Sequence, residues 1–417
     1  MKVFKFGGAS VKDAAGVRNV AKVLRHFPND DLLIVVSAMG KTTNALEEVV
    51  WAFRESADVT DSIEALRRSH MVVLAEVAPD DVAAGAELVL HFDRLSTFLK
   101  GKPSANVDRD YDQIVSQGEI WSTLIVSAHL KGAGLANKWV DARTIVRTDD
   151  TYRSARMDWD LSARRASGLL DEVEGRPRRI VTQGFIGFTS EGDTTTLGRE
   201  GSDFSAAIFA YLLDAESVTI WKDVPGMFNA DPKRFPDTKL LSHISYKEAI
   251  ELSYFGASVI HPRTLQPLQR KSIPLYVRSF LDLDAAGSTI DERSENDSLI
   301  PSFIIKPGQV LISITPRDLS FIVEENLSGI FGVFAKHGVC INLMQNSAVA
   351  FTVCVDNDNR VKPLVLDLRS EYEVRWNEGL ELVTVRHYDE PTLAKLLHDR
   401  ETLIEQRSRT TARFVVK

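Results

Sequence analysis

The sequence predicts an α/β fold with a mainly parallel sheet in its first two thirds and a smaller α+β unit in its last third. Three observations support this prediction. Short apolar segments of strand length alternate with helix-like segments in the first part. A polar stretch at residues 286–298 contains few core-forming side chains and separates the two parts. Beyond it, apolar segments follow one another in the order of a βαββαβ unit.

The first part contains four segments that we expect to be strands, at residues 3–6, 32–36, 179–187 and 217–221. Small or turn-forming residues follow each of them. In parallel α/β sheets, ligands bind beyond the carboxyl ends of the strands. The polar residues that follow these strands are therefore the candidates for a functional site.

The last part begins with an expected strand at residues 309–315 and a helix that buries Leu327, Ile330, Phe331 and Phe334 on one face. Strands at 340–344 and 349–355, a helix at 362–370 and a strand at 380–385 complete one unit, at about 307–388. A helix at 391–398 and strands at 403–406 and 411–416 look like a partial second copy. We therefore expect one domain at 1–298 and a second at 299–417.

Composition excludes several classes of protein. Of the 417 residues, 44% are hydrophobic and 26% are charged, and the net charge of -8 argues against both disorder and nucleic-acid binding. The longest apolar runs are too short to span a membrane, and Gly7 and Gly8 interrupt any signal-peptide core. Cys340 and Cys354 are the only cysteines, so no disulfide framework or metal-ligand spacing is present. We expect a cytoplasmic protein without nucleic-acid or membrane partners.

The segment at residues 194–203 carries the richest chemistry. It combines Arg199, two glycines, Ser202 and Asp203 in what we expect to be one turn, and a predicted helix follows it directly. The N-terminus of a helix attracts anions, which suits phosphate chemistry. An ordinary glycine-rich loop with a helix cap would have a similar composition, so this segment needs partners elsewhere.

Two further segments lie at the ends of the first two predicted strands. Lys5 offers a positive charge beside Gly7 and Gly8, whose backbone N–H groups can approach phosphate oxygens without side-chain obstruction. A solvated strand lysine is the alternative, and the segment is not a P-loop motif. In the stretch 37–45, hydroxyl groups such as those of Ser37 and Thr43 can hold a carboxylate, or else cap a helix.

The remaining candidate segments supply a carboxylate and a charged loop. Glu119 stands at the expected start of a helix, where it can bind a substrate ammonium or simply compensate the helix dipole. The loop at 221–233 alternates carboxylates with lysines and can hold a nucleotide or serve as a surface connection. Together, the segments provide cations for phosphate, donors for a carboxylate and an anion for an amine.

These segments resemble, in the same order along the chain, the motifs of monofunctional aspartate kinases (aspartokinases), which belong to the amino-acid kinase superfamily and carry a C-terminal regulatory region of the ACT type. The resemblance spans essentially the whole length and includes residues 184–187 and 256–262. It implies a three-layer α/β/α catalytic domain and ATP-dependent phosphorylation of the L-aspartate side chain to 4-phospho-L-aspartate. That reaction leads toward lysine, threonine, methionine and diaminopimelate.

The resemblance also implies residue roles. Lys5 would stabilise the transferring phosphoryl group and Asp203 would position the cationic groups. Arg199 would bind an aspartate carboxylate and Glu119 the α-amino group, while the remaining aspartate-binding residues would be Ser37, Thr43 and Ser202. Magnesium would be bound mainly through ATP. The residues implied in ATP binding are Lys5, Gly7, Gly8, Lys222, Asp223, Phe228, Asp231 and Lys233.

The ACT-type region implies a homodimer or higher homo-oligomer and an effector site for lysine or threonine. The implied effector residues are Leu327, Ser328, Gly329, Ile330, Cys340, Ile341 and Asn342. Glu324, Glu325 and Asn326 do not clearly reproduce either effector signature, so a plain dimerisation module stays open. Ser258 stands where some relatives carry lysine, and we expect no direct nucleotide contact from it.

Two alternative functions remain. One is a related kinase for glutamate, acetylglutamate or a nucleoside monophosphate. The segments 116–119 and 198–203 favour aspartate as the substrate instead. The other is a non-catalytic amino-acid sensor, against which the retention of Lys5, Glu119, Arg199 and Asp203 speaks.

Overall fold

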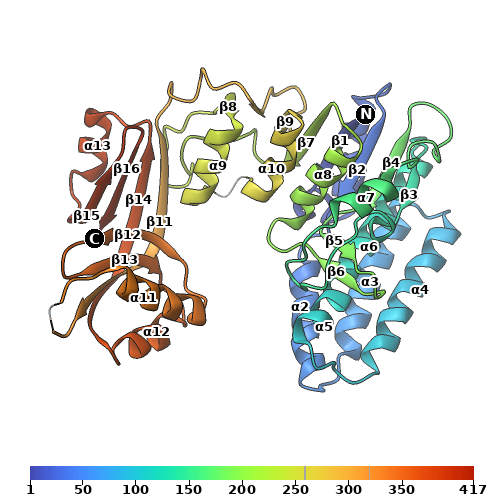
Figure 1. The fold of residues 1–417 in the computed structure, drawn as a ribbon. Coiled ribbons are helices and arrows are strands. Elements are labelled where there is room, and N and C mark those ends of the chain that lie inside the picture. The colour runs from blue at the N-terminus through green and yellow to red at the C-terminus, as the bar shows by residue number, and fades with distance from the viewer. Residues whose placement is uncertain (258–259, 319) are drawn as a thin grey trace. The chain divides into compact units, whose positions relative to one another are not determined.

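The computed structural model describes residues 1–257, 260–318 and 320–417, which form two compact units (Figure 1). Unit 1 comprises Met1–Met227, Leu240–Ile250 and Val259–Ser294. Unit 2 comprises Phe228–Lys239, Glu251–Ser258 and Glu295–Lys417.

Unit 1 is built on an eight-stranded sheet with the strand order β3-β4-β2-β1-β7-β9-β10-β8. Among the described residues, every neighbouring pair of strands is parallel except β9 and β10. Strands β2 and β4 are buried along their whole length, as expected of apolar segments covered on both faces. The bounds are β1 Lys2–Phe6, β2 Leu32–Val36, β3 Lys138–Val140, β4 Arg179–Gln183, β7 Ser217–Lys222, β8 His243–Ser245, β9 Leu275–Ser279 and β10 Ser288–Asp291.

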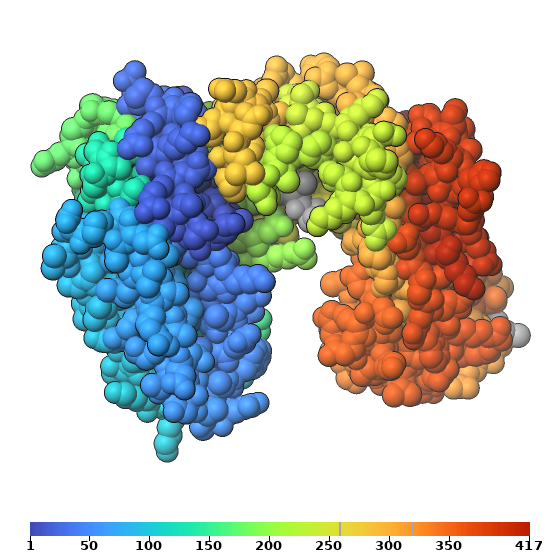
Figure 2. Space-filling view, turned by 180° about the vertical axis from the view of Figure 1, so that it is seen from behind, coloured from blue at the N-terminus to red at the C-terminus, as the bar shows by residue number. Residues whose placement is uncertain are grey.

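Helices cover this sheet. Helix α6 packs against β2, β3 and β4, while α8 packs against β1, β2 and β7, which gives the expected α/β/α layers. Helices α3 and α4 form part of the surface of unit 1, seen in light blue in Figure 2. The bounds are α1 Ala14–Arg25, α2 Thr42–Arg54, α3 Thr60–Val77, α4 Val82–Leu99, α5 Val107–Val115, α6 Gln117–Gly132, α7 Trp159–Ala166, α8 Gly201–Leu212, α9 Tyr246–Phe255 and α10 Pro262–Arg270, with 3-10 helices η1 Gly8–Val11 and η2 Ala142–Thr144.

Two expectations for unit 1 were wrong in detail. The single strand expected at 179–187 is divided, because the chain turns at Gly184 and Phe185, where Phe185 has a φ of 70°. A Cβ on Gly184 would lie 2.6 Å from the Cβ of Ser202, so only glycine permits this close approach to α8. Strand β5 (Ile186–Phe188) then pairs with β6 (Thr194–Thr196), and the expected turn at 194–203 is restricted to residues 197–200.

Unit 2 contains a six-stranded antiparallel sheet with the order β12-β13-β11-β14-β16-β15. The chain order β11-α11-β12-β13-α12-β14 confirms the expected βαββαβ plan. The strands β15 and β16, which follow α13, extend the same sheet. The bounds are β11 Ser302–Pro316, α11 Glu324–His337, β12 Ile341–Asn346, β13 Phe351–Asp356, α12 Val361–Leu368, β14 Tyr372–Arg386, α13 Glu390–Leu397, β15 Thr402–Arg407 and β16 Thr411–Val416.

One hydrophobic cluster of unit 2 lies between this sheet and the helices α11 and α12. Ile330 and Phe334 of α11 are buried in it, together with Leu364 of α12. Phe331, which we expected on the same buried face, is 41% exposed. Within the described parts of the chain, no helix combines the length and apolarity needed to cross a membrane.

Candidate active site

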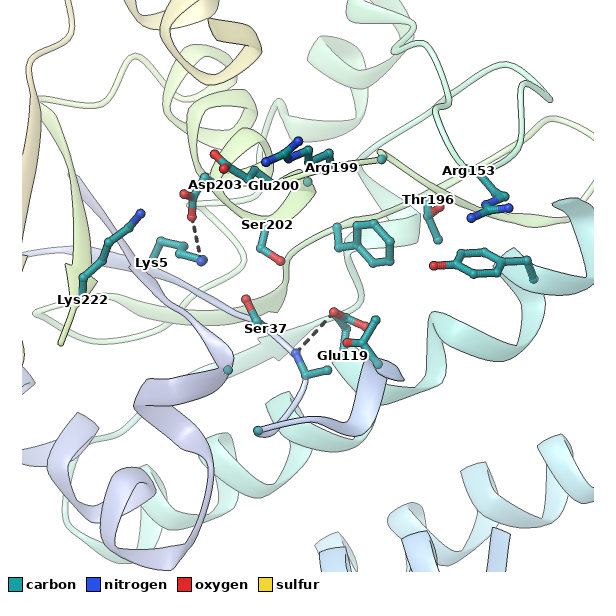
Figure 3. A pocket seen from close by; sticks show the side chains of 18 residues that line it. Lys5, Ser37, Glu119, Arg153, Thr196, Arg199, Glu200, Ser202, Asp203 and Lys222 are labelled. Carbon is teal, nitrogen blue, oxygen red and sulfur yellow. Dashed lines mark hydrogen bonds and ion pairs between the residues drawn. The ribbon is translucent and has the colours of Figure 1, made fainter. Parts of the chain in front are cut away.

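A cavity of about 540 Å³ in unit 1 lies where β1 and β2 end and where α8 begins (Figure 3). Residues distant in the sequence meet here, as expected of the carboxyl edge of a parallel sheet. The lining residues are Lys5, Gly8, Ser37, Ala38, Gly40, Thr43, Tyr111, Glu119, Arg153, Phe185, Thr196, Gly198, Arg199, Glu200, Gly201, Ser202, Asp203 and Lys222.

Strand β1 positions Lys5, because its neighbours β2 and β7 hold it on both sides. The Lys5 Nζ lies 2.6 Å from Oδ1 of Asp203, and the two side chains are only 11% and 5% exposed. Asp203 belongs to the first turn of α8, so the ion pair holds the ammonium near the positive end of that helix. A phosphate group bound at this point would interact with both the Lys5 ammonium and the positive N-terminus of α8.

The loops after β1 and β2 pack backbone against backbone. The Gly40 N–H donates a hydrogen bond of 3.1 Å to the carbonyl of Gly8. A Cβ on Gly8 would lie 2.9 Å from the carbonyl oxygen of Ala38, closer than real side chains come to backbone. Gly8 is therefore required for the two loops to meet, and its backbone stays accessible to a ligand.

Glu119 lies buried in the first turn of α6 and lines the cavity. Its Oε1 accepts a hydrogen bond of 3.3 Å from the N–H of Ala38, while its buried Oε2 has no hydrogen-bond partner among the described residues. Burial raises the pKa of Glu119 to about 8, despite the opposing effects of the Ala38 N–H and the Lys5 charge. A carboxylate with an unpaired buried oxygen is suited to receive a cationic ligand group.

Hydroxyl groups and a guanidinium complete this part of the cavity. Ser37 and Ser202 lie between the Lys5–Asp203 pair and Glu119 (Figure 3). Arg199 is exposed and forms no hydrogen bond or ion pair with the described residues, which leaves its donors for a ligand. The Thr42 hydroxyl donates to the carbonyl of Met39 at 2.7 Å, whereas Thr43 lines the cavity, so the two hydroxyls serve different purposes.

The sequence profile of the amino acid kinase family matches residues 1–279. The chain is 31% identical over 395 residues to the lysine-sensitive aspartokinase 3 of Escherichia coli, and the alignment covers 92% of this chain and 86% of that protein. The chain belongs to the aspartokinase family. It spans only 39% of the length of a bifunctional aspartokinase/homoserine dehydrogenase from Arabidopsis thaliana, to which it is 32% identical over 368 residues.

Solved structures of E. coli aspartokinase III have the same fold. The structure with lysine and aspartate, described as the T-state, superposes with a TM-score of 0.83 at 28% identity, and the one with aspartate and ADP, described as the R-state, with 0.81 at 28% identity. Each comparison covers 100% of this chain and 96% of the other.

The cavity of this aspartokinase also includes two residues outside the segments that the sequence pointed to, Tyr111 and Arg153. The guanidinium of Arg153 lies 4.2 Å from the ring centroid of Tyr111, whose hydroxyl donates to Glu47 at 2.6 Å. No local motif marks Arg153, because only the tertiary structure brings it to this cavity.

Behind these residues, Asp112 joins the loop that carries Arg153 to the end of strand β6. Its Oδ2 accepts hydrogen bonds from the backbone N–H groups of Arg153 at 3.0 Å and Thr196 at 2.8 Å. Its Oδ1 accepts the hydroxyl of Thr196 at 2.7 Å. Burial raises the pKa of Asp112 to about 6, although these hydrogen bonds oppose the shift. No sequence motif marked Asp112, because its burial depends on packing between distant segments.

Only some of the residues expected to bind the nucleotide lie at this cavity. Lys222 and Gly8 line the cavity, and Gly7 adjoins it, because a Cβ there would lie 3.2 Å from the Nζ of Lys5. Asp223 is exposed in unit 1 and does not line the cavity. Three others belong to unit 2, and their part in nucleotide binding stays a prediction: Phe228, Asp231 and Lys233. Ser258 lies outside the described residues.

The expected effector residues of this aspartokinase lie in unit 2. One group is in the first half of α11 (Leu327, Ser328, Gly329 and Ile330), and the other lies at β12 (Cys340, Ile341 and Asn342). The amide of Asn342 donates to Gln309 at 2.9 Å and accepts from Lys306 at 3.0 Å. Its side chain therefore already takes part in the polar network of the sheet, and its effector role stays a prediction.

Proposed function

We propose that the cavity of unit 1 binds L-aspartate beside the phosphates of ATP, and that this aspartokinase transfers the γ-phosphoryl group to the side-chain carboxylate of aspartate. The product is 4-phospho-L-aspartate. The observation that carries the proposal is that the Lys5–Asp203 ion pair, the buried Glu119 and the exposed Arg199 line one cavity. The similar E. coli enzyme, solved with aspartate and ADP, supports the choice of substrates.

The chemistry requires positioning and charge neutralisation more than proton transfer. The acceptor carboxylate already carries the attacking oxygen, so no strong base is needed. Two anions must approach each other, and Lys5, the backbone around Gly8 and the N-terminus of α8 offset their repulsion. Asp203 keeps the Lys5 ammonium in place. We propose direct transfer without a covalent enzyme intermediate.

The aspartate itself would be recognised at both ends. The unpaired oxygen of Glu119 would receive the α-ammonium, and Arg199 would donate to a carboxylate in the bidentate manner of guanidinium groups. Hydroxyls of Ser37, Thr43 and Ser202 would supply the remaining donors. A ligand ammonium would restore the charge that burial disfavours on Glu119.

Magnesium would enter with ATP. Among the described residues no group of three His, Cys, Asp or Glu side chains is arranged to hold a metal ion. We propose that phosphate oxygens would coordinate most of the magnesium. Bound there, it would neutralise part of the phosphate charge. The proposed ATP-binding residues are Lys5, Gly7, Gly8, Lys222, Asp223, Phe228, Asp231 and Lys233.

We further propose a kinase domain at 1–298 and a regulatory domain at 299–417 whose ACT-like sheet pairs chains into a homodimer or higher oligomer. Lysine is the proposed effector, supported by the lysine-sensitive relative and by the solved neighbour that holds lysine. Location in the cytoplasm stays a prediction from composition.

The test is an acyl-phosphate assay. The protein is incubated with Mg·ATP and either L-aspartate, L-glutamate, N-acetyl-L-glutamate or no acceptor, and hydroxylamine traps any acyl phosphate as a hydroxamate. Aspartate alone should yield hydroxamate above the control without acceptor. A signal with glutamate instead, or with no acceptor at all, would reject the proposed substrate.

A further inference from the structure

Unit 1 contains a second cavity, of about 630 Å³, which shares no lining residue with the first among the described residues. Helices α4, α5, α6 and α7, the 3-10 helix η2 and the β5–β6 hairpin contribute to its wall. Its volume falls within the range of small-molecule sites.

The wall of this cavity is strongly basic. Four guanidinium groups line it, on Arg94, Arg143, Arg147 and Arg165, against a single lining carboxylate, Asp141, in the described structure. Asp141 is already paired with Arg143, whose Nη2 lies 2.6 Å from Oδ2. Arg94 and Arg165 are exposed and form no hydrogen bond or ion pair with the described residues. This positive excess stands out in a chain whose net charge is -8.

The other charged groups nearby do not cancel this excess. His91 also lines the cavity, but burial lowers its pKa, so it adds little charge, and its Nε2 lies 3.4 Å from Glu87. Asp158 attracts Arg147 electrostatically, but its carboxylate caps the N-terminus of α7 through the Leu161 N–H.

Arg147 is the member of the group with a buried donor that lacks a partner among the described residues. Its Nη2 donates to the carbonyl of Thr189 at 2.6 Å and its guanidinium lies 5.1 Å from the Phe188 ring centroid. Its Nε is buried without a hydrogen-bond partner among the described residues. Burial, and secondly the charge of Arg165, hold the pKa of Arg147 below its usual value. Unpaired buried donors and clustered like charges both cost free energy, which an anionic ligand would offset.

We propose that this cavity binds a small phosphate-bearing metabolite, held by Arg94, Arg147 and Arg165. One guanidinium group can donate two parallel hydrogen bonds to two oxygens of the same phosphate. Several guanidinium groups together are suited to a ligand that carries several negative charges. Leu95, Phe98 and Phe188 would contact its carbon skeleton. The site is separate from the proposed aspartate cavity and does not depend on that assignment.

Titration calorimetry with inorganic pyrophosphate, and with citrate as a carboxylate of comparable charge, tests the proposal. The variants are Arg165→Gln and the double variant Arg94→Gln/Arg165→Gln. Arg164→Gln is the matched control, because Arg164 is the exposed neighbour on α7 and does not line the cavity. All the substituted side chains are exposed, so the fold should persist, which thermal unfolding checks.

Pyrophosphate should bind the parent protein and the Arg164→Gln control alike, and bind about tenfold more weakly to Arg165→Gln. In the double variant this binding event should disappear, while any binding at the aspartate cavity remains. Equal affinity for pyrophosphate in Arg164→Gln and in the double variant would overturn the proposed site. Tighter binding of citrate than of pyrophosphate, lost in the same variants, would overturn the choice of phosphate.

Discussion

The ammonium of Lys5 lies 2.6 Å from the carboxylate of Asp203, and this ion pair joins the end of β1 to the first turn of α8. If Lys5 acts on the transferring phosphoryl group, Lys5→Ala should lower kcat at least about 100-fold, while the KM for aspartate changes far less. Steady-state kinetics of purified variants measures both. Lys2→Ala, on the same strand with its partner Asp30, is the control. Similar turnover in the two variants would refute the role of Lys5.

Arg199 is expected to act on binding rather than on turnover. Because its guanidinium lines the cavity without a protein partner among the described residues, Arg199→Ala should raise the KM for aspartate about tenfold or more with a smaller change in kcat. The exposed Arg164 on α7, changed to alanine, gives a surface control. An unaltered aspartate saturation curve would count against the assignment.

Aspartate binding should depend on pH through Glu119, whose pKa burial raises to about 8. Only the ionised carboxylate attracts an ammonium, so affinity should be highest above this pKa. It should fall as the pH drops below it, with KM rising by up to about tenfold per pH unit.

The comparison for this pH profile is Glu119→Gln. It should bind aspartate more weakly at high pH and show a nearly flat KM between about pH 6 and pH 9. The same slope in the parent protein and the variant would mean that another group is responsible.

Asp112 should matter for stability. Asp112→Ala removes three hydrogen bonds to a buried carboxylate and leaves the N–H groups of Arg153 and Thr196 without their acceptor. We expect a loss of about 3 kcal/mol in the free energy of unfolding, measured by urea denaturation. The exposed Asp108 on the same helix offers a control whose removal should cost less than about 1 kcal/mol. Equal losses of unfolding free energy in the Asp112 and Asp108 variants would show that the hydrogen bonds of Asp112 do not stabilise the fold.

A methyl group on Gly8 should separate the loops that follow β1 and β2, because it would lie 2.9 Å from the Ala38 carbonyl oxygen. Gly8→Ala should therefore lower kcat by about 100-fold through displaced backbone groups. Gly85→Ala is the control, since a Cβ there meets nothing within 4 Å and alanine should stabilise α4 by about 0.5–1 kcal/mol. Full activity of the Gly8 variant would show that the close approach is dispensable.

Local patterns predicted the secondary structure of several segments closely. The apolar run of β2 and the strand β16 have the bounds expected from the sequence. The expected strand at 179–187 was wrong because the turn at Phe185 depends on the approach of Gly184 to Ser202, a contact between distant parts of the chain. Strands β9 and β10 were not predicted.

By itself, the sequence determined which chemical groups are available and that they follow strands of an α/β sheet, because periodicity and turn residues act over short stretches of chain. Only the tertiary structure decided that Lys5 meets Asp203, that Glu119 is buried with one unpaired oxygen, and that Asp112 holds Arg153 and Thr196. It also placed the arginines of α4, η2 and α7 around a second cavity. Burial and Coulomb energies depend on distances in space, and these distances are set by packing between segments far apart in the chain.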